Sequence, residues 1–507
     1  MSILDTQEFD MIQHPPRTET RRFFASIVIV STLALALGLT LKTPTQLEAN
    51  DISRWCTVWS LLERGTYAID DCPWQNRTQD KVKKVAPFQA IGRDKTPSEH
   101  YYSSKPPLLP TMIAGILYPV RKVTGLALDS VIERPRHEHS VQIADKNAPG
   151  GLRFVTEKPK DTVKWPVLVL YLKPMVVLFN IVPMFAFLVL FARLLDRHAE
   201  NDWSYFFGLF SAALGTLLLV FDQTLNNHTV AAYAGFFALY SFLKIWSDGS
   251  RGFWTFASAG FWSAFCACNE LPAALFGILL FLVLLVRFPR KTLIAFVIAA
   301  IVPCAGFLAT QYAAFGTPRP VYEEFGTKSY NYKGSYWNMP LEMDYLNVPK
   351  ITATKTKGPT FQESYQLYLF HMTFGHHGVF SLTPIFLFSA AGACRAMFGR
   401  LRSLRTAAWL TTILTIAMFA FYDWNPKARN YGGSTQGLRW LFWLMPFYLI
   451  FLPAGVVGGQ TKRWVRSIAL MALFVSALSV GYALHSPWSH PWILDLMEHL
   501  GLYELRR

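Results

Sequence analysis

Long apolar blocks, separated by short basic or polar segments, cover most of the chain. A helix that crosses a membrane needs about 20 mainly apolar residues. A stretch from Phe253 to Val286 is too long for one span, and Asn269, Glu270 and Pro272 interrupt it, which predicts two short helices meeting at a polar turn. The other clear blocks are Phe23–Leu41, Trp165–Leu195, Trp203–Phe221, Val230–Trp246, Thr292–Phe315, Gly378–Phe398, Thr406–Tyr422, Leu438–Val456 and Val465–Leu484. The pattern therefore predicts an all-α polytopic membrane protein with about eleven spans.

The block Ser103–Val120 differs from the other apolar segments. It contains Pro110 and Pro119 and continues directly into Arg121 and Lys122. If it does not cross the membrane, the short basic loops all fall on the cytoplasmic side, as the positive-inside rule requires. Those loops contain Arg193/Arg197, Lys244/Arg251, Arg287/Arg290/Lys291, Arg395/Arg400/Arg402/Arg405 and Lys462/Arg463/Arg466. We therefore expect Ser103–Val120 to form a juxtamembrane helix on the outer surface.

The basic residues Arg17, Arg21 and Arg22 precede the first apolar block and place the N-terminus in the cytoplasm. The block has a long leader and no convincing small-residue cleavage site, so it is expected to remain as an anchor helix. The predicted organisation is a cytoplasmic N-terminus (1–22), a first span (23–41), a first extracytoplasmic loop with juxtamembrane helices (42–164), further spans (165–315), a second extracytoplasmic loop (316–377), C-terminal spans (378–484) and an extracytoplasmic tail (485–507). This topology fits a multi-pass protein of the inner, cytoplasmic membrane.

Composition supports the membrane assignment. Of the 507 residues, 52% are hydrophobic and only 16% are charged, whereas soluble domains carry about 25% charged residues. A chain of several soluble domains is thus excluded. The net charge of +15 would suggest a nucleic-acid partner in a soluble protein, but here much of it lies in the short basic loops that set topology. We expect no nucleic-acid partner.

Metal and nucleotide chemistry have little support in the sequence. Cys56 and Cys72 both lie in the first long loop, where pairing in an oxidising compartment and two free thiols are equally compatible with their spacing. His376 and His377 have no third ligand at a recognisable spacing, so no metal site is predicted. No glycine-rich nucleotide-binding loop is present in the sequence either.

Asp51 and Arg54 lie about ten residues beyond the first span. Three residues apart on a helix, they share one face. The carboxylate can hold a reacting hydroxyl and the guanidinium a phosphate, although an interfacial salt bridge is the simpler reading. Lys105, before two prolines, suits an anionic lipid headgroup, and interfacial snorkelling is its alternative.

These segments resemble the first loop of family-39-type GT-C membrane glycosyltransferases, which include aminoarabinose transferases for lipid A and protein O-mannosyltransferases. The matching segments are Asp51-x-x-Arg54-Trp55, Leu62-x-x-Gly65-x-Tyr67 and Tyr102-x-x-Lys105-Pro106-Pro107-Leu108. Two weaker similarities are Phe374-Gly375-His376-His377-Gly378-Val379-Phe380-x-x-Thr383-Pro384 and Asn430-Tyr431-Gly432-Gly433-x-x-x-Gly437-Leu438-Arg439-Trp440. Ile52 replaces a glutamate of the family, and the insert Asp129–Lys160 has no counterpart.

The resemblance implies a GT-C-type bundle that takes a sugar from a polyprenyl-phosphate donor and transfers it to a lipid, glycan or protein acceptor outside the cytoplasm. It also implies that Asp51 is the catalytic carboxylate. The lipid-linked sugar is then a substrate, and no separate cofactor is expected.

The chemistry of such a transfer indicates which residue types are needed. The sugar leaves a phosphate that departs as a stabilised anion, so the acceptor hydroxyl needs a base while cations neutralise the phosphate. Asp51 is the expected base and Arg54, Lys105 and Arg439 are the expected phosphate ligands. A single displacement with one base inverts the anomeric centre. For Arg439, snorkelling at a helix end is an equally good alternative.

Two further residues, His228 and Glu270, are candidates for the sugar pocket. His228 follows two asparagines at a helix start, where a capping or packing role is more common. Glu270 interrupts apolar sequence, and a carboxylate inside the membrane is a functional candidate.

A transporter or a flippase of lipid-linked sugars is the main alternative function, and a non-catalytic assembly protein is a third. Transporters place charged residues at mid-membrane in broken helices of related halves. Only Glu270 and Lys173 fit that description, and no internal repeat is evident in the sequence. Two long outer loops also favour an enzyme over a transporter.

The predicted topology can be tested with reporters fused at the C-terminus. Because the tail after residue 484 is expected outside the cytoplasm, an alkaline phosphatase fused after Arg507 should be active and a green fluorescent protein there should be dark. A fluorescent fusion of the full-length chain would contradict the odd number of spans.

Overall fold

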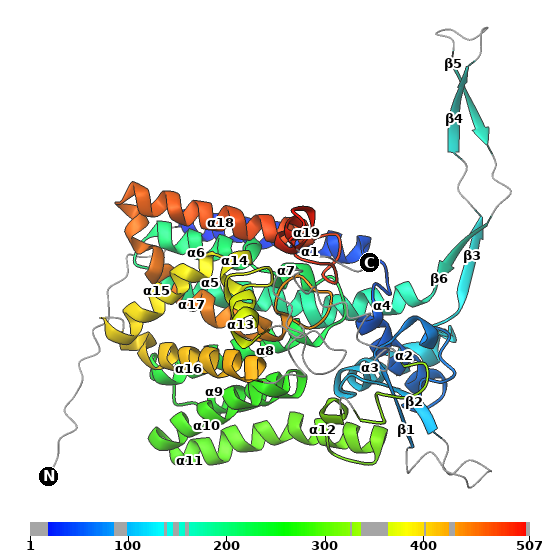
Figure 1. Ribbon diagram of the computed structural model, residues 1–507, viewed down its shortest axis with the longest axis horizontal. Coiled ribbons are helices and arrows are strands. Elements are labelled where there is room, and N and C mark those ends of the chain that lie inside the picture. Colours follow the sequence, from blue (N-terminus) through cyan, green and yellow to red (C-terminus); the bar gives the residue numbers. More distant parts are fainter. Residues whose placement is uncertain are drawn as a thin grey trace.

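The computed structural model is an elongated bundle of helices with a thin arm of strands at one end (Figure 1). It describes residues 19–85, 99–135, 139–144, 152–157, 162–324, 327–335, 364–399, 402–424 and 431–502. The protein is mostly helical within these ranges, as the apolar blocks predict.

The first half of the chain forms a long helix, two short helices at one end of the bundle, and then a run of packed apolar helices. These are α1 (Glu19–Lys42), α2 (Ala49–Glu63), α3 (Leu108–Thr124), α4 (Leu168–Val176), α5 (Val182–His198), α6 (Asp202–Leu214), α7 (Leu218–Phe221), α8 (Asn227–Trp246), α9 (Phe253–Asn269) and α10 (Ala274–Arg287). A π turn (Val177–Ile181) joins α4 to α5 in one continuous apolar segment.

The second half continues the bundle. Its helices are α11 (Pro289–Lys291), α12 (Val297–Phe315), α13 (Tyr365–Thr373), α14 (Val379–Leu382), α15 (Ile385–Phe398), α16 (Arg402–Trp424), α17 (Met445–Val456), α18 (Arg463–Ala483) and α19 (Trp492–His499). Short turns are Gln75–Arg77, Leu271–Ala273, Thr292–Phe296, Val321–Glu324, Arg439–Leu444 and Val457–Gln460.

Eight helical segments of the described chain are long and apolar enough to cross a membrane. They are Glu19–Lys42, Leu168–His198, Asp202–Phe221, Asn227–Trp246, Pro289–Phe315, Ser403–Trp424, Arg439–Gln460 and Arg463–Ala483. Leu271–Arg287 and Ile385–Phe398 are apolar but shorter. A multi-pass architecture is therefore confirmed, while the total of about eleven spans stays a prediction.

The break predicted near Glu270 is confirmed. Helix α9 ends at Asn269, and a single turn at Leu271–Ala273, with Pro272 inside it, leads into α10. Proline has no N–H to donate, which suits the first turn of the new helix.

The segment Ser103–Val120 forms α3 from Leu108 onward, and it is not among the long apolar spans. It starts after Pro107, ends at Gly125 in the left-handed conformation (φ 68°), and packs on α2. Its other face leaves apolar side chains exposed, Val123 by 87%. An amphipathic helix of this kind suits a membrane surface, and its position on the outer face stays a prediction.

Three two-stranded antiparallel ribbons depart from the all-α expectation. The strands are β1 (Lys81–Val85), β2 (Glu99–Ser103), β3 (Val131–Pro135), β4 (His139–Ala144), β5 (Leu152–Glu157) and β6 (Thr162–Pro166). β1 pairs with β2, β3 with β6 and β4 with β5. The last two ribbons form the arm that extends away from the helices (Figure 1), and three of their four strands lie in the insert Asp129–Lys160, with β6 just after it.

Helix α8 lies at the centre of the bundle and is buried along most of its length. Aromatic rings fill the contact between α8 and α5. The ring of Phe187 lies edge to face against that of Phe236, with centroids 4.7 Å apart, and is tilted against that of Tyr233 at 5.7 Å. Such offset ring pairs add about 0.5–1.5 kcal/mol beyond the area they bury. The centre of the bundle is therefore a fixed frame for the polar start of α8.

Cys56 and Cys72 are buried in a second core between α2, α3 and α4 and are both free thiols in the structure. Their side chains contact each other, so the loop that carries Cys72 is packed directly on α2.

Helices α15 and α17 approach each other through glycine. A Cβ atom added to Gly392 would lie 1.9 Å from the carbonyl oxygen of Phe451, and one added to Gly455 would lie 1.9 Å from that of Phe388. Small residues let apolar helices pack backbone to backbone. This pair of helices therefore has no room for a methyl group at either glycine.

Replacing Gly392 by alanine should consequently destabilise the bundle by about 1–3 kcal/mol, the usual cost of overpacking. Gly481→Ala in α18 is the matched control, because nothing lies within 4 Å of its added Cβ and alanine favours helix. Thermal unfolding in detergent measures both variants. Equal melting temperatures for the two would contradict the close packing.

Candidate functional site

The loops at one end of the bundle are joined by polar contacts. Thr43 donates to Gln223 at 2.5 Å, and Gln223 donates to the carbonyl of Leu484 at 3.3 Å. Asn227 Nδ2 donates to the carbonyl of Asn269 at 2.9 Å. Loops predicted to share one side of the membrane are thus brought together, with α2 and α3 at the same end (Figure 1).

Asp51 caps the start of α2. Its carboxylate accepts from the backbone N–H groups of Leu47 (3.0 Å), Glu48 (2.8 Å) and Ile52 (2.9 Å). An acidic residue in the first turn also suits the helix dipole. Burial raises the pKa of Asp51 to about 6, against the lowering effect of these hydrogen bonds and of Arg54. The carboxylate is therefore engaged by its own helix.

Arg54 lies one turn further along α2 and is 1% exposed. One guanidinium nitrogen donates to the carbonyl of Asn50 at 2.8 Å and also contacts its side chain, and another contacts Oδ1 of Asn227. Burial lowers the pKa of Arg54 to about 10, with Asp80 as the largest opposing charge. The group stays cationic at neutral pH and has a fixed direction.

Asp80 is the carboxylate that faces the cations. Its side chain pairs with Lys105 Nζ at 2.9 Å. Its carbonyl accepts from Ser104 N at 3.0 Å and from Ser53 Oγ at 2.5 Å, so the β1–β2 ribbon fixes it against α2. Burial raises the pKa of Asp80, but Lys105, Arg439 and Arg54 together lower it below its usual value.

Lys105 follows the end of β2, directly before the two prolines that precede α3. Its ammonium is largely buried, 19% exposed, beside Asp80. Burial lowers the pKa of Lys105, Asp80 raises it, and Arg54 and Arg439 lower it further. Three cations therefore act on one another at this point.

Arg439 opens the turn that leads into α17. Its guanidinium lies 4.8 Å from the centre of the Trp488 ring and interacts electrostatically with Asp80 and Glu270. Its buried Nε has no hydrogen-bond partner among the described residues. A buried donor without a partner is costly, and an anion bound beside it would remove that cost.

The side chains of Glu270 and His228 contact each other, and both are buried. Asn227 Nδ2 donates to Glu270 at 2.5 Å while its oxygen accepts from Arg54. Asn227 therefore links the cation of α2 to the carboxylate at the break between α9 and α10. The stretch Asn226–Thr229 also caps α8, since Asn226 accepts from Thr229 N at 2.9 Å.

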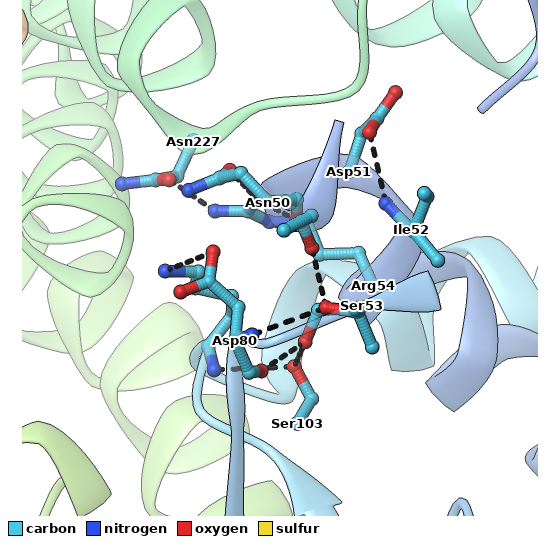
Figure 2. Close-up of polar contacts among 11 residues, drawn as sticks. Asn50, Asp51, Ile52, Ser53, Arg54, Asp80, Ser103 and Asn227 are labelled. Carbon is cyan, nitrogen blue, oxygen red and sulfur yellow. Dashed lines mark hydrogen bonds and ion pairs between the residues drawn. The ribbon is translucent and has the colours of Figure 1, made fainter. Parts of the chain in front are cut away.

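Figure 2 shows how these groups lie. Arg54, Asn50 and Asn227 converge on one side of α2 near Asp80, whereas the carboxylate of Asp51 is directed away from them. The charges of Lys173 and Asp51 attract each other, and the Lys173 ammonium donates to the carbonyl of Thr40 at 2.5 Å.

Of the residues selected from the sequence, the structure brings together the expected phosphate ligands Arg54, Lys105 and Arg439. The carboxylates that act on Arg54 are Asp80, Asp51 and Glu270, and Asp80 and Glu270 also act on Arg439, so three carboxylates oppose these three cations. The roles of the three cations, and that of Asp51, stay predictions.

Sequence reasoning missed Asp80 and Asn227. Asp80 has no motif around it, and its one signal is its place directly before the strand-like run Lys81–Val85. Asn227 was visible only as one of the two asparagines that precede His228. Both gain their importance from residues more than twenty positions away in the sequence, which no local pattern records.

The histidines of the second long loop form an aromatic stack. His371 and His376 lie 3.9 Å apart and His377 lies 4.5 Å from Tyr431, between ring centroids. Among the described residues, no group of three or more metal-ligating side chains is arranged to hold an ion.

No protein-family model matches the chain, and no curated protein matches it. The similarity to GT-C glycosyltransferases therefore depends on the short segments around Asp51, Lys105 and Arg439.

The Asp80–Lys105 pair should contribute to stability mainly by charge compensation. Lys105→Met leaves Asp80 without its nearest cation and should cost about 2 kcal/mol, between the values for exposed and buried pairs. The double variant Asp80→Asn/Lys105→Met should recover at least half of that loss. Thermal unfolding in detergent measures both, and a double variant less stable than Lys105→Met would refute the interpretation.

Proposed function

We propose that the protein is a GT-C-type membrane glycosyltransferase that moves a sugar from a polyprenyl-phosphate donor to a hydroxyl or phosphate acceptor on the extracytoplasmic face. The observation that carries the proposal is the convergence of Arg54, Lys105 and Arg439 around Asp80, together with a buried Nε of Arg439 that has no hydrogen-bond partner among the described residues. Bringing several cations together out of water costs free energy. The negative charge of a bound phosphate would offset that cost.

The three cations would bind the phosphate of the lipid donor. Arg54 and Arg439 offer planar donor groups that match phosphate oxygens, and Lys105 adds a point charge. Charge that develops on the departing phosphate meets preorganised cations in a poorly solvated site, where each is worth more than in water. No acid is needed to protonate this leaving group.

In this proposal Asp80 is the base. Before the donor binds, Lys105 keeps the pKa of Asp80 low. A phosphate that attracts Lys105 and brings negative charge would raise the pKa of Asp80 and make it a better proton acceptor. The acceptor oxygen then attacks the anomeric carbon, its proton passes to Asp80, and the bond from carbon to phosphate oxygen breaks. The anomeric centre is inverted.

Asp51, to which the resemblance assigns the base role, would instead orient the helix that carries Arg54. Three backbone N–H groups occupy its carboxylate, and it points away from Asp80. Its catalytic role stays a prediction that the assay below tests directly. His228 and Glu270, linked to Arg54 through Asn227, are the groups proposed to contact the sugar.

The alternative of a transporter or flippase finds less support. A transporter interpretation relies on two charged residues, Lys173 and Glu270. Lys173 donates to the carbonyls of Thr40 and Thr43 and so caps the C-terminal end of α1. Glu270 lies at the same end of the bundle as Arg54, to which Asn227 connects it.

The proposal is tested by incubating purified protein with a panel of radiolabelled polyprenyl-phosphate sugars and membrane extract, and following release of polyprenyl phosphate. Asp80→Asn should slow release by about 10²–10⁴-fold, the usual contribution of a general base. Arg439→Gln and Lys105→Met should raise the donor KM. Arg64→Gln is the control, because Arg64 is an exposed cation at the end of the same helix.

Each outcome bears on a separate part of the proposal. If Asp51→Asn loses transfer while a folded Asp80→Asn variant keeps it, the base is Asp51, as the resemblance implies. If sealed vesicles move the labelled lipid across the bilayer and none of the panel is consumed, the protein is a flippase and the enzyme proposal fails.

A further inference from the structure

A polar pocket lies beside the β1–β2 ribbon, separate from the cluster of charged residues around Asp80. Its volume is about 220 Å³, and it is lined by Lys83, Lys84, Val85, Glu99, Lys328, Ser329 and Tyr332. None of these residues belongs to the site described above.

The walls of this pocket are anchored to the core. The backbone N–H of Lys83 donates to the carbonyl of Ser329 at 2.9 Å, so the segment Thr327–Ser335 lies along the free edge of β1. Tyr330 in that segment is buried with Val82 and Tyr102 in one apolar cluster. The pocket is therefore built by a strand edge and a packed loop.

Three lysines line the pocket, and two of them are paired with carboxylates. Lys84 pairs with Glu324 at 2.6 Å, and Lys83 pairs with Glu99 at 2.8 Å. Lys328 is exposed and pairs with no carboxylate within the described ranges. Among the described residues, Lys328 is therefore the pocket lysine that no carboxylate pairs with, and it is the one offered to an anion from solution.

An aromatic wall accompanies these lysines. Tyr332 lines the pocket and packs edge to face on Tyr101, with ring centroids 5.5 Å apart. Lys81 lies 5.0 Å from the Tyr101 ring on its side of the ribbon. A tyrosine offers an apolar face and a polar hydroxyl, a combination that suits the C–H face and the hydroxyls of a pyranose ring.

The pocket is close to the Asp80 cluster along the chain. Lys83 follows Asp80 by three residues of extended strand, which corresponds to about 10 Å. An extended glycan whose reacting end lies at Asp80 would therefore reach the pocket with its next sugars.

We propose that this pocket binds an anionic carbohydrate, a sugar that carries a phosphate or carboxylate group, through Lys328 and Tyr332. Its assignment as part of the acceptor depends on the proposed function. The binding itself needs no turnover, so it can be measured separately from the enzymatic activity.

The test is direct binding to the full-length protein in detergent, with glucose 6-phosphate as the probe and glucose and inorganic phosphate as comparisons. We expect glucose 6-phosphate to bind more tightly than either comparison. Lys328→Glu should weaken it by about tenfold or more, because it replaces the available cation with a like charge. Lys333→Glu is the matched control, since Lys333 is exposed in the same loop but does not line the pocket.

Tyr332→Ala tests the contribution of the sugar ring separately from that of the phosphate. It should weaken the binding of glucose 6-phosphate and leave the binding of inorganic phosphate unchanged. The proposal is overturned if Lys328→Glu and Lys333→Glu bind the probe alike, or if phosphate binds the native protein as tightly as glucose 6-phosphate. Loss of sugar transfer in Asp80→Asn with binding retained would support both proposals, while binding without any transferase activity would leave only the pocket.

Discussion

The compensation of buried charge at Asp80 is the constraint on which the polar end of this bundle depends. Arg54 is buried and Lys105 and Arg439 are half-buried, and the strongest opposite charge on all three is Asp80, which pairs with Lys105 at 2.9 Å. Cations in such surroundings repel one another strongly. Asp80, Asp51 and Glu270 offset that repulsion and so help the loops that carry the cations to pack together.

This constraint connects distant parts of the chain. Helix α2 supplies Arg54, the β1–β2 ribbon supplies Asp80 and Lys105, and the turn before α17 supplies Arg439. The start of α8 adds Asn227, which hydrogen-bonds on both sides. The apolar helices behind them give rigidity, through ring stacking around α8 and glycine contacts between α15 and α17. A preformed polar site on a rigid bundle is the arrangement that the proposed transfer would need.

The sequence predicted the fold better than it predicted the site. Apolar blocks of about 20 residues identify spanning helices because the bilayer leaves the backbone few alternatives, and Pro272 marked the break after α9 correctly. The ribbons of the insert were missed because their strands are only five or six residues long and contain too few apolar residues to stand out beside the long apolar blocks. At the site, the cations were found from local motifs, whereas Asp80 has no motif and matters only through its spatial neighbours.

The sequence by itself determined a helical membrane protein, the break at Asn269–Glu270 and the clustering of polar loops, because hydrophobic period and length are local properties. The tertiary structure alone decided which carboxylate faces the cations. Asp51 and Asp80 are both acidic and both buried. One is occupied by the N–H groups at the start of α2, and the other is aimed at Lys105 by the pairing of β1 with β2. The difference arises from the position of each aspartate on the folded backbone, which the residue types alone do not determine.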